Sequence, residues 1–407
     1  YNKDVKVYNK NAFYPAETVA VSEPTVIRGV DASIVGITPF RYNPVTKELV
    51  VIRDMEIEVT FEGGNGVFGD LKYRNRFWDP ILNDMLLNAD MLPEVDYSKR
   101  TYGAKDETGC EYVIITPTGA DFVAWADSIK KFRNRQGILT QVFTLEEVGG
   151  NTTSAIENFI NDAYNNWDIP PAAALLLGDY GDDITTSVVS PIWDSYCVSD
   201  NIYADVNNND MPDVVFARIT ARNAAELELM INKFLNYEKN PPVSPDFYNH
   251  PITALGWQTE RWFQICSESV GGYFKNIHGK DPVRINAVYG GNPNSDPWST
   301  ATNTAQVLSV FGPDGLGYIP ASPGELGGWS GGTATMVTNA INDGAFILQH
   351  RDHGGENGWG EPDYDNGDIQ NLTNTDLTFV FSINCLTGKY NISGECFAEA
   401  FHRHGHG

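Results

Sequence analysis

The sequence is poor in cysteine and in long apolar runs. Only five cysteines occur among 407 residues. They are too few and too irregularly spaced for a disulfide framework or a zinc ribbon, and an odd number leaves at least one thiol free. No apolar run approaches the roughly 18 residues that a membrane-spanning helix needs. With 42% hydrophobic and 20% charged residues, the chain is predicted to be a soluble globular protein of two or three domains.

Basic residues are also scarce. Lys and Arg number 28 against 53 Asp and Glu, which gives a formal charge of −25 at pH 7. This charge repels phosphate, so nucleic acid and anionic membrane surfaces are poor partners, whereas cations and basic polypeptides fit better. Residues 1–100 carry 12 basic and 15 acidic side chains. Nearly all of the excess acidity therefore lies after residue 100.

The first hundred residues have the pattern of a small antiparallel β domain. Residues 48–52 and 55–61 alternate apolar and polar side chains, which is typical of half-buried strands. We therefore expect a β-rich domain over residues 1–100. It ends at the dibasic pair Lys99-Arg100, a common kind of cleavage site for processing proteases, although two solvated linker charges would look the same.

Strands and helices alternate from residue 108 onward. The predicted strands are 112–116, 139–144, 172–177, 253–257, 284–289, 345–349 and 379–383, and the predicted helices are 121–135, 154–167, 269–277 and 333–342. Such alternation implies an α/β fold with mostly parallel sheets flanked by helices. A proline-rich connection at 240–245 divides this part into two adjacent subdomains, residues 101–245 and 246–407.

Two reactive side chains follow directly after predicted strands. His353 comes after the strand at 345–349 and Cys385 after the strand at 379–383, and open α/β sheets bind ligands beyond the carboxyl ends of their strands. A cysteine attacks acyl groups as a thiolate, which needs a neighbouring imidazole. The amides of Gly354 and Cys385 could form an oxyanion hole. Taken alone, the spacing equally fits a small core cysteine and a structural histidine.

Four segments around these residues form a more specific pattern. They are HGGENGW at 353–359, LTN at 372–374, NCLTG at 384–388 and CFAEA at 396–400. This pattern resembles the gingipain family of cysteine peptidases, whose fold is related to that of caspases and legumain. The resemblance implies that Cys385 is the nucleophile and His353 the general acid and base. Residues 1–100 resemble the propeptide of the same family, so Lys99-Arg100 would be the activation junction.

The resemblance also implies two acidic site residues. Glu260, in the segment Trp257-Gln258-Thr259-Glu260, occupies the place of the residue that orients the histidine, and a carboxylate there would favour the imidazolium form. A solvated loop carboxylate is the alternative. The best-known family members cleave after Arg or Lys, which requires a carboxylate in the substrate pocket. Glu268 lies near the place where one branch of the family has it.

Oxygen-bearing side chains recur at every second residue from Asp205 onward. Asp205, Asn207 and Asn209 alternate in this way and Asp213 follows, which is how calcium loops space their ligands. Asp179, in a loop after another predicted strand, adds a carboxylate. The resemblance also implies structural calcium in this region, whereas an Asn-rich turn is the alternative.

The predicted function is a secreted or cell-surface cysteine endopeptidase in precursor form. Its expected partners are polypeptide substrates and its own propeptide, with no nucleic acid and no membrane span, and the residues predict no oligomeric state. Secretion follows from the resemblance and from calcium. Catalytic domains of the family that the chain resembles continue beyond the position of residue 407, so we expect a further carboxyl-terminal part.

Two other functions are compatible with the residues. One is a non-catalytic surface module of the same fold that binds calcium and a partner protein. The other is a metal-dependent hydrolase in which oxygen and imidazole ligands hold the ion. Its ligands would be His350, Asp352, His353, Asp363 and Asp365.

Overall fold

The computed structural model of the chain describes residues 3–60, 62–63, 69–97, 108–329 and 331–407, so the predicted junction Lys99-Arg100 lies outside the described residues. The chain forms two compact units. The first contains residues 1–112, 160–174 and 203–215, and the second contains residues 113–159, 175–202 and 216–407. None of the described helices is long and apolar enough to cross a membrane.

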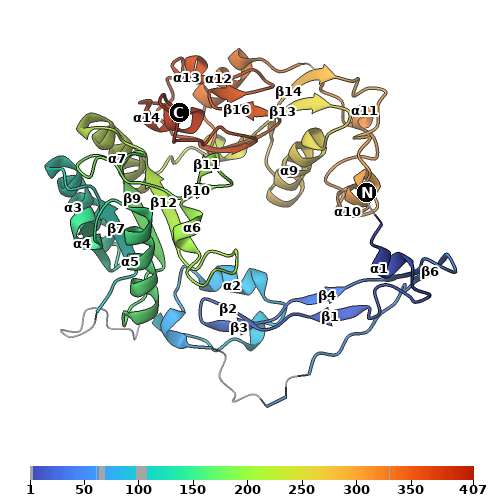
Figure 1. The fold of residues 1–407 in the computed structure, drawn as a ribbon. Coiled ribbons are helices and arrows are strands. Elements are labelled where there is room, and N and C mark those ends of the chain that lie inside the picture. Colours follow the sequence, from blue (N-terminus) through green and yellow to red (C-terminus); the bar gives the residue numbers. More distant parts are fainter. Residues whose placement is uncertain (1–2, 61, 64–68, 98–107, 330) are drawn as a thin grey trace. The chain divides into compact units, whose positions relative to one another are not determined.

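Short antiparallel strands dominate the amino-terminal part of the first unit (Figure 1), as predicted. The pairs are β1 with β4, β2 with β3 and β5 with β6. Their bounds are β1 (Val19–Val21), β2 (Thr25–Ile27), β3 (Val30–Ala32), β4 (Val35–Ile37), β5 (Phe40–Asn43) and β6 (Glu48–Val51). The predicted strand at 55–61 is wrong, since residues 55–60 form no strand. An alternating pattern becomes a strand only where a neighbouring strand pairs with it.

A helical segment completes this part of the first unit. Its elements are η1 (Leu71–Tyr73), α2 (Asp79–Met85) and η2 (Ala89–Met91), whereas the short helix α1 (Val5–Tyr8) precedes the strands. Leu82 of α2 is fully buried, and the indole Nε1 of Trp78 donates a hydrogen bond to the carbonyl oxygen of Ala172 at 3.0 Å. The segment is therefore packed against other residues of the same unit rather than being a free linker.

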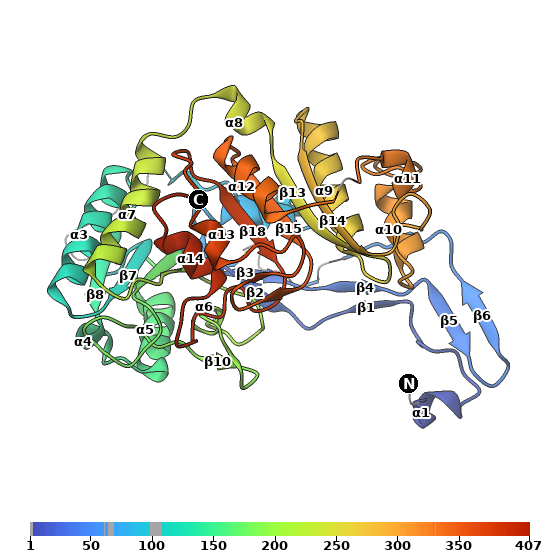
Figure 2. The same ribbon diagram turned by 90° about the horizontal axis from the view of Figure 1, so that it is seen from above.

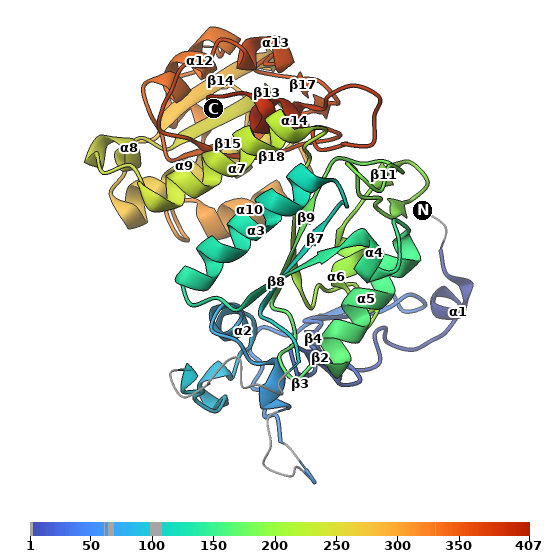
Figure 3. The same cartoon turned by 90° about the vertical axis from the view of Figure 1, so that its left-hand side faces the viewer.

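The first α/β sheet has the strand order β12-β9-β7-β8. Its central strands β7 and β9 are buried along nearly their whole length, as expected for strands covered on both faces. Helices α3 and α7 lie side by side next to it (Figure 3). The strands and helices of this region are β7 (Tyr112–Thr116), α3 (Ala120–Arg135), β8 (Thr140–Thr144), α4 (Leu145–Val148), α5 (Thr153–Asn166), β9 (Ala173–Leu177), β10 (Ile192–Trp193), β11 (Cys197–Val198), α6 (Asn201–Ala204), β12 (Val215–Ile219) and α7 (Ala224–Lys239).

The second α/β sheet has the strand order β14-β13-β15-β18, and all its neighbouring strands are parallel. This confirms the predicted α/β class. The elements of this region are α8 (Pro245–Asn249), β13 (Ile252–Gln258), α9 (Phe263–His278), β14 (Val283–Gly290), α10 (Thr304–Phe311), α11 (Pro323–Leu326), α12 (Ala334–Asn342), β15 (Ile347–Arg351), β16 (Gly354–Gly355), β17 (Gly358–Trp359), α13 (Asn366–Ile369), β18 (Phe379–Ile383) and α14 (Phe397–Arg403).

Helices cover both faces of the second sheet (Figures 1 and 2). On one face, Leu348 of β15 packs in a buried cluster with residues of α12 and α14, among them Val337 and Phe397. On the other face, Trp257 of β13 packs with Ile265 of α9. Because successive strand residues point to opposite faces, this packing fixes which side chains of β15 and β18 lie against the core.

Helix α9 is longer than the sequence pattern predicted. It begins at Phe263, whereas the periodicity predicted a start at residue 269. The first turns carry Gln264, Ser267 and Glu268, which read as polar loop residues in the sequence but are all buried. Polar side chains that find partners inside the protein do not show in an apolar periodicity.

Candidate active site

Cys385 and His353 lie at the same edge of the second sheet. In the parallel pair of β15 and β18, Arg351 is opposite Ile383. His353 and Cys385 each stand two residues beyond these partners, so they leave the sheet in matching register. Neighbouring strands run about 4.8 Å apart, and both side chains are exposed. The fold thus brings both residues to the carboxyl ends of two adjacent strands.

Gly354 lies directly against the cysteine loop. A Cβ atom on Gly354 would be 2.8 Å from the carbonyl oxygen of Cys385 and 2.8 Å from the side-chain oxygen of Asn384. Only glycine fits such a close approach. The backbone N–H of Cys385 donates no hydrogen bond to another described residue. It is therefore free to face a substrate oxygen, as the predicted oxyanion donor must.

The two loops that carry the candidate dyad are also tied together. The Lys389 ammonium, after Cys385, lies 2.8 Å from the carboxylate of Glu356, after His353. Between Cys385 and Lys389, the main chain of Leu386 has a left-handed φ of 60°, which is a costly conformation for a residue with a side chain. Such strain persists only where surrounding contacts hold the loop.

Gln258 is the direct polar neighbour of His353. Its Oε1 lies 3.1 Å from the imidazole Nε2, and its Nε2 donates to the carboxylate of Glu260 at 2.5 Å. The predicted third residue, Glu260, therefore reaches the histidine through the amide of Gln258. Sequence reasoning missed Gln258, although it stands in the same strand-end segment.

The amide of Gln258 also determines where the imidazole carries its proton. A carboxylate accepts hydrogen bonds, so the amide nitrogen must face Glu260 and the amide oxygen must face His353. An amide oxygen is an acceptor, which requires a proton on Nε2 of His353. In the neutral imidazole, Nδ1 is then the basic nitrogen.

Aromatic and basic side chains form one wall beside the histidine. The ring of Phe263 packs edge-on against His353 with ring centroids 5.0 Å apart. The guanidinium of Arg351 lies over Phe263 at 4.7 Å and donates to the carbonyl oxygen of Ile383 at 2.9 Å. The imidazole is therefore restrained by a ring as well as by Gln258.

A buried carboxylate stands immediately before the histidine. Asp352 is 2% exposed, and the hydroxyl of Tyr289 donates to it at 2.8 Å. Burial raises the pKa of the Asp352 carboxyl above its ordinary value. A Cβ on Gly256 would collide with this carboxylate at 2.4 Å. These contacts of the buried Asp352 thus hold the start of the loop that carries His353.

Glu268 has a partner of its own. Its carboxylate is 3% exposed, receives hydrogen bonds from the Arg284 guanidinium at 2.7 to 3.0 Å, and accepts a further one from Asn286 at 3.1 Å. A pocket carboxylate must instead be free for the substrate. These contacts give Glu268 a role in packing α9 on β14 and argue against the predicted role in substrate binding.

The predicted calcium ligands fall into two places. In the first unit, both carboxylate oxygens of Asp205 accept backbone N–H groups, from Asn209 at 3.0 Å and Asp210 at 2.9 Å. The buried carboxylate of Asp213 accepts from the side-chain amide of Asn207 at 3.1 Å. Many of the oxygens that calcium would need are thus engaged within the loop.

Asp179 is not part of that loop. It belongs to the second unit, where its carboxylate lies 2.8 Å from the guanidinium of Arg403. Among the described residues, no group of three or more His, Cys, Asp or Glu side chains is arranged to hold a metal ion. Calcium binding stays a prediction.

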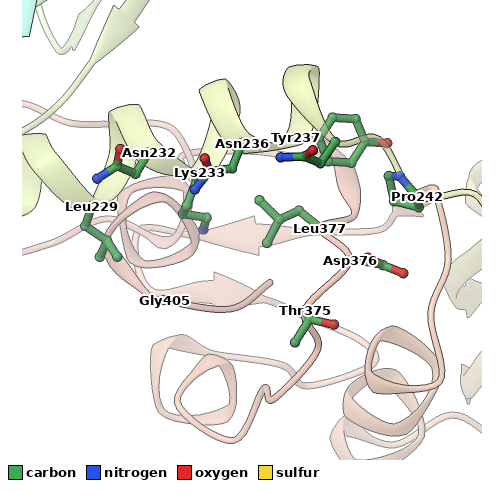
Figure 4. Close-up of a pocket in the computed structure, with 11 residues that line it drawn as sticks. Leu229, Asn232, Lys233, Asn236, Tyr237, Pro242, Thr375, Asp376, Leu377 and Gly405 are labelled. Atoms are coloured by element: carbon green, nitrogen blue, oxygen red, sulfur yellow. The ribbon is translucent and has the colours of Figure 1, made fainter.

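A pocket of about 310 Å³ lies between α7 and the segment before β18 (Figure 4). Thr375, Asp376 and Leu377 line it at the amino end of β18, whereas Cys385 follows the carboxyl end of this strand. The Lys233 ammonium near this pocket donates to the carbonyl oxygens of Phe401 and His404 at 2.7 and 2.9 Å. The pocket is therefore separate from the candidate active site.

The sequence profile named Peptidase family C25 matches residues 105–407, and the profile named Propeptide_C25 matches residues 1–72. The chain belongs to peptidase family C25. The prediction from the four motifs is thereby confirmed, and so is the prediction that a propeptide precedes the catalytic part.

Individual C25 relatives are distant in sequence. Gingipain R2 of Porphyromonas gingivalis is 24% identical over 409 residues, which cover 97% of this chain and 48% of the relative. Lys-gingipain of the same organism is 23% identical over 406 residues, covering 97% of this chain and 20% of the relative. The chain thus spans half or less of the length of these relatives.

Solved structures support the fold. The crystal structure of the Arg-specific cysteine proteinase gingipain R matches with a TM-score of 0.55 at 20% identity, covering 75% of this chain and 61% of that one. The complex of the pro- and mature domains of RgpB from P. gingivalis matches with a TM-score of 0.54 at 19% identity, covering 72% and 60%. At this identity the likeness concerns the fold alone.

Proposed function

We propose that this C25 chain is the precursor of a secreted or cell-surface cysteine endopeptidase. Cys385 attacks the peptide carbonyl, His353 accepts the thiol proton and passes it to the leaving amine, and water hydrolyses the resulting thioester. The amides of Gly354 and Cys385 stabilise the oxyanion. The single observation that carries this proposal is the parallel pairing of β15 with β18, in which Arg351 lies opposite Ile383, two residues before His353 and Cys385.

Cleavage after Arg or Lys is the proposed specificity. It is supported by the names of relatives, one Arg-specific and one a Lys-gingipain, and by the excess of 53 acidic over 28 basic residues, which attracts basic polypeptides. The pairing of Glu268 with Arg284 speaks against Glu268 as the carboxylate that recognises the basic side chain.

The contacts of His350 speak against the metal-dependent hydrolase. Both of its ring nitrogens are engaged within the protein, with Asn384 at 2.8 Å and with the carbonyl oxygen of Glu361 at 3.1 Å. A ligand histidine must offer one ring nitrogen to the ion. His350 therefore does not serve as the ligand that this alternative requires.

The experiment is peptide hydrolysis by the processed protein. Reporter peptides ending in Arg, Lys, Ala or Glu before the cleaved bond are compared, with Cys385→Ala as the control and with and without a calcium chelator. Hydrolysis that Cys385→Ala abolishes supports the peptidase. No hydrolysis of any peptide by a folded, processed protein of full natural length overturns it and favours the non-catalytic module. If the unaltered protein loses hydrolysis only when the chelator is present, the activity depends on calcium as well as on Cys385.

A further inference from the structure

A second histidine, His350, lies within β15, three residues before His353. His350 is fully buried, and its ring stacks on the indole of Trp359, with centroids 3.9 Å apart and planes inclined by 3°. Its Nε2 lies 3.1 Å from the carbonyl oxygen of Glu361, and its Nδ1 lies 2.8 Å from the side-chain nitrogen of Asn384. Asn384 directly precedes the nucleophile.

Only one assignment of hydrogen-bond donors and acceptors is consistent with these contacts. A carbonyl oxygen can only accept, so Nε2 of His350 carries a proton and donates to Glu361. Burial lowers the pKa of His350 to about 3, and the charge of Arg351 acts in the same sense. The ring is therefore neutral, its Nδ1 is an acceptor, and the amide nitrogen of Asn384 must donate to it.

The orientation of the Asn384 amide determines the hydrogen bonds of the side chains around the cysteine. With its nitrogen towards His350, its oxygen faces the Thr387 hydroxyl, which donates at 2.7 Å. The Ser382 hydroxyl lies 3.0 Å from the Asn384 nitrogen and accepts from the indole of Trp359 at 2.8 Å. Every polar side chain of the network thus has a partner, a condition under which buried networks specify a single arrangement.

The network brackets Cys385 from both sides. Asn384 precedes the cysteine, and Thr387 follows it after the left-handed Leu386. The amide of Thr387 also donates to the carbonyl oxygen of Cys385 at 2.8 Å. A chain of hydrogen bonds thus runs from His350 through Asn384 to Thr387, on the far side of Leu386.

We propose that His350 is a positioning residue, whose neutral Nε2–H imidazole orients Asn384 and thereby sets the direction of the Cys385 thiol. The inference rests on the proposed nucleophilic role of Cys385. His350 itself touches no reacting atom. It acts on the nucleophile through Asn384, whereas His353, beyond the carboxyl end of β15, exchanges the proton.

The first test is the rate of alkylation of Cys385 by iodoacetamide, followed at pH 6 to 9 by mass spectrometry of the peptide that contains it. His350→Phe keeps the stacking on Trp359 and removes both hydrogen bonds. We expect alkylation about tenfold slower at pH 7 and, with an active enzyme, a lower kcat at unchanged KM. His278→Phe on α9, an exposed histidine that contacts Tyr273, is the matched control and should behave as the unaltered protein.

A second variant separates positioning from stability. In His350→Phe/Asn384→Leu both partners of the His350–Asn384 hydrogen bond are apolar, and the Thr387 hydroxyl, which loses Asn384, keeps the Ser382 hydroxyl at 3.2 Å. Stability should therefore return towards that of the unaltered protein. Positioning predicts that alkylation stays slow although the thermal midpoint recovers. A folded His350→Phe protein whose Cys385 is alkylated within twofold of the unaltered rate overturns the inference, as does recovery of alkylation together with stability.

A third measurement uses the unaltered protein. In protein labelled with ¹⁵N-histidine, the His350 nitrogens should show the neutral Nε2–H tautomer throughout pH 5 to 8. A proton on Nδ1 would overturn the inference. Failure of the proposed function would give a different result. If the Cys385→Ala variant still cleaves peptides normally, Cys385 is not the nucleophile. The alkylation and tautomer results, in contrast, report on the role of His350.

Discussion

Gln258→Met tests whether the histidine is oriented through an amide. The change keeps the length of the side chain and removes the acceptor 3.1 Å from Nε2 of His353 and the donor 2.5 Å from Glu260. The imidazolium that forms during catalysis loses a hydrogen bond worth about 1.5–3 kcal/mol. At about 1.36 kcal/mol per decade, kcat/KM should fall about 10- to 160-fold.

The assay is a double-variant cycle on the best reporter peptide. Glu260→Gln lowers kcat/KM in the unaltered background, but in the Gln258→Met background it should have no further effect, since Glu260 acts through Gln258. Gln306→Met, an exposed glutamine of α10, is the control and should leave kcat/KM unchanged. Activity of Gln258→Met within twofold of the unaltered enzyme, or losses that simply add in the double variant, would refute the reasoning.

Three further predictions concern stability and specificity. Glu268→Gln leaves the partly exposed Arg284 guanidinium beside a neutral group, so we expect a loss of about 2 kcal/mol in urea unfolding. The ratio of Arg to Lys cleavage should stay unchanged, and a changed ratio would restore Glu268 to the substrate pocket. Burial lowers the pKa of Lys233 to about 8 from 10.5. The unfolded chain then binds more protons between these values, so stability should rise by up to about 3 kcal/mol as the pH increases from 8 to 10.5, and Lys233→Met should flatten this rise. The Arg28 guanidinium is 1% exposed and donates to the carbonyl oxygens of Pro171 and Asp213 at 3.0 and 2.9 Å. Arg28→Met should therefore lower the urea midpoint of the uncleaved chain by an amount equivalent to about 2 kcal/mol, while Arg41→Met, at a partly exposed arginine, should change it little.

The sequence by itself determined the class of fold and the places of the two reactive side chains. Apolar runs such as 379–383 became the strands of the second sheet, as expected for short apolar segments rich in β-branched and aromatic residues. His353 and Cys385 could be placed at a sheet edge because parallel strands share one carboxyl edge. The motifs around them identified the family.

Only the tertiary structure decided how these residues are supported. The pairing of β15 with β18 brings His353 and Cys385 to neighbouring strand ends, and no local pattern encodes which strands are neighbours. Gln258, Tyr289 and His350 act through contacts across strands, with partners up to 95 residues away in the sequence. Glu268 looked available in the sequence, because the Arg284 that neutralises it lies on another strand. Charge and periodicity are properties of a segment, whereas the partner of a buried polar group is a property of the whole packed core.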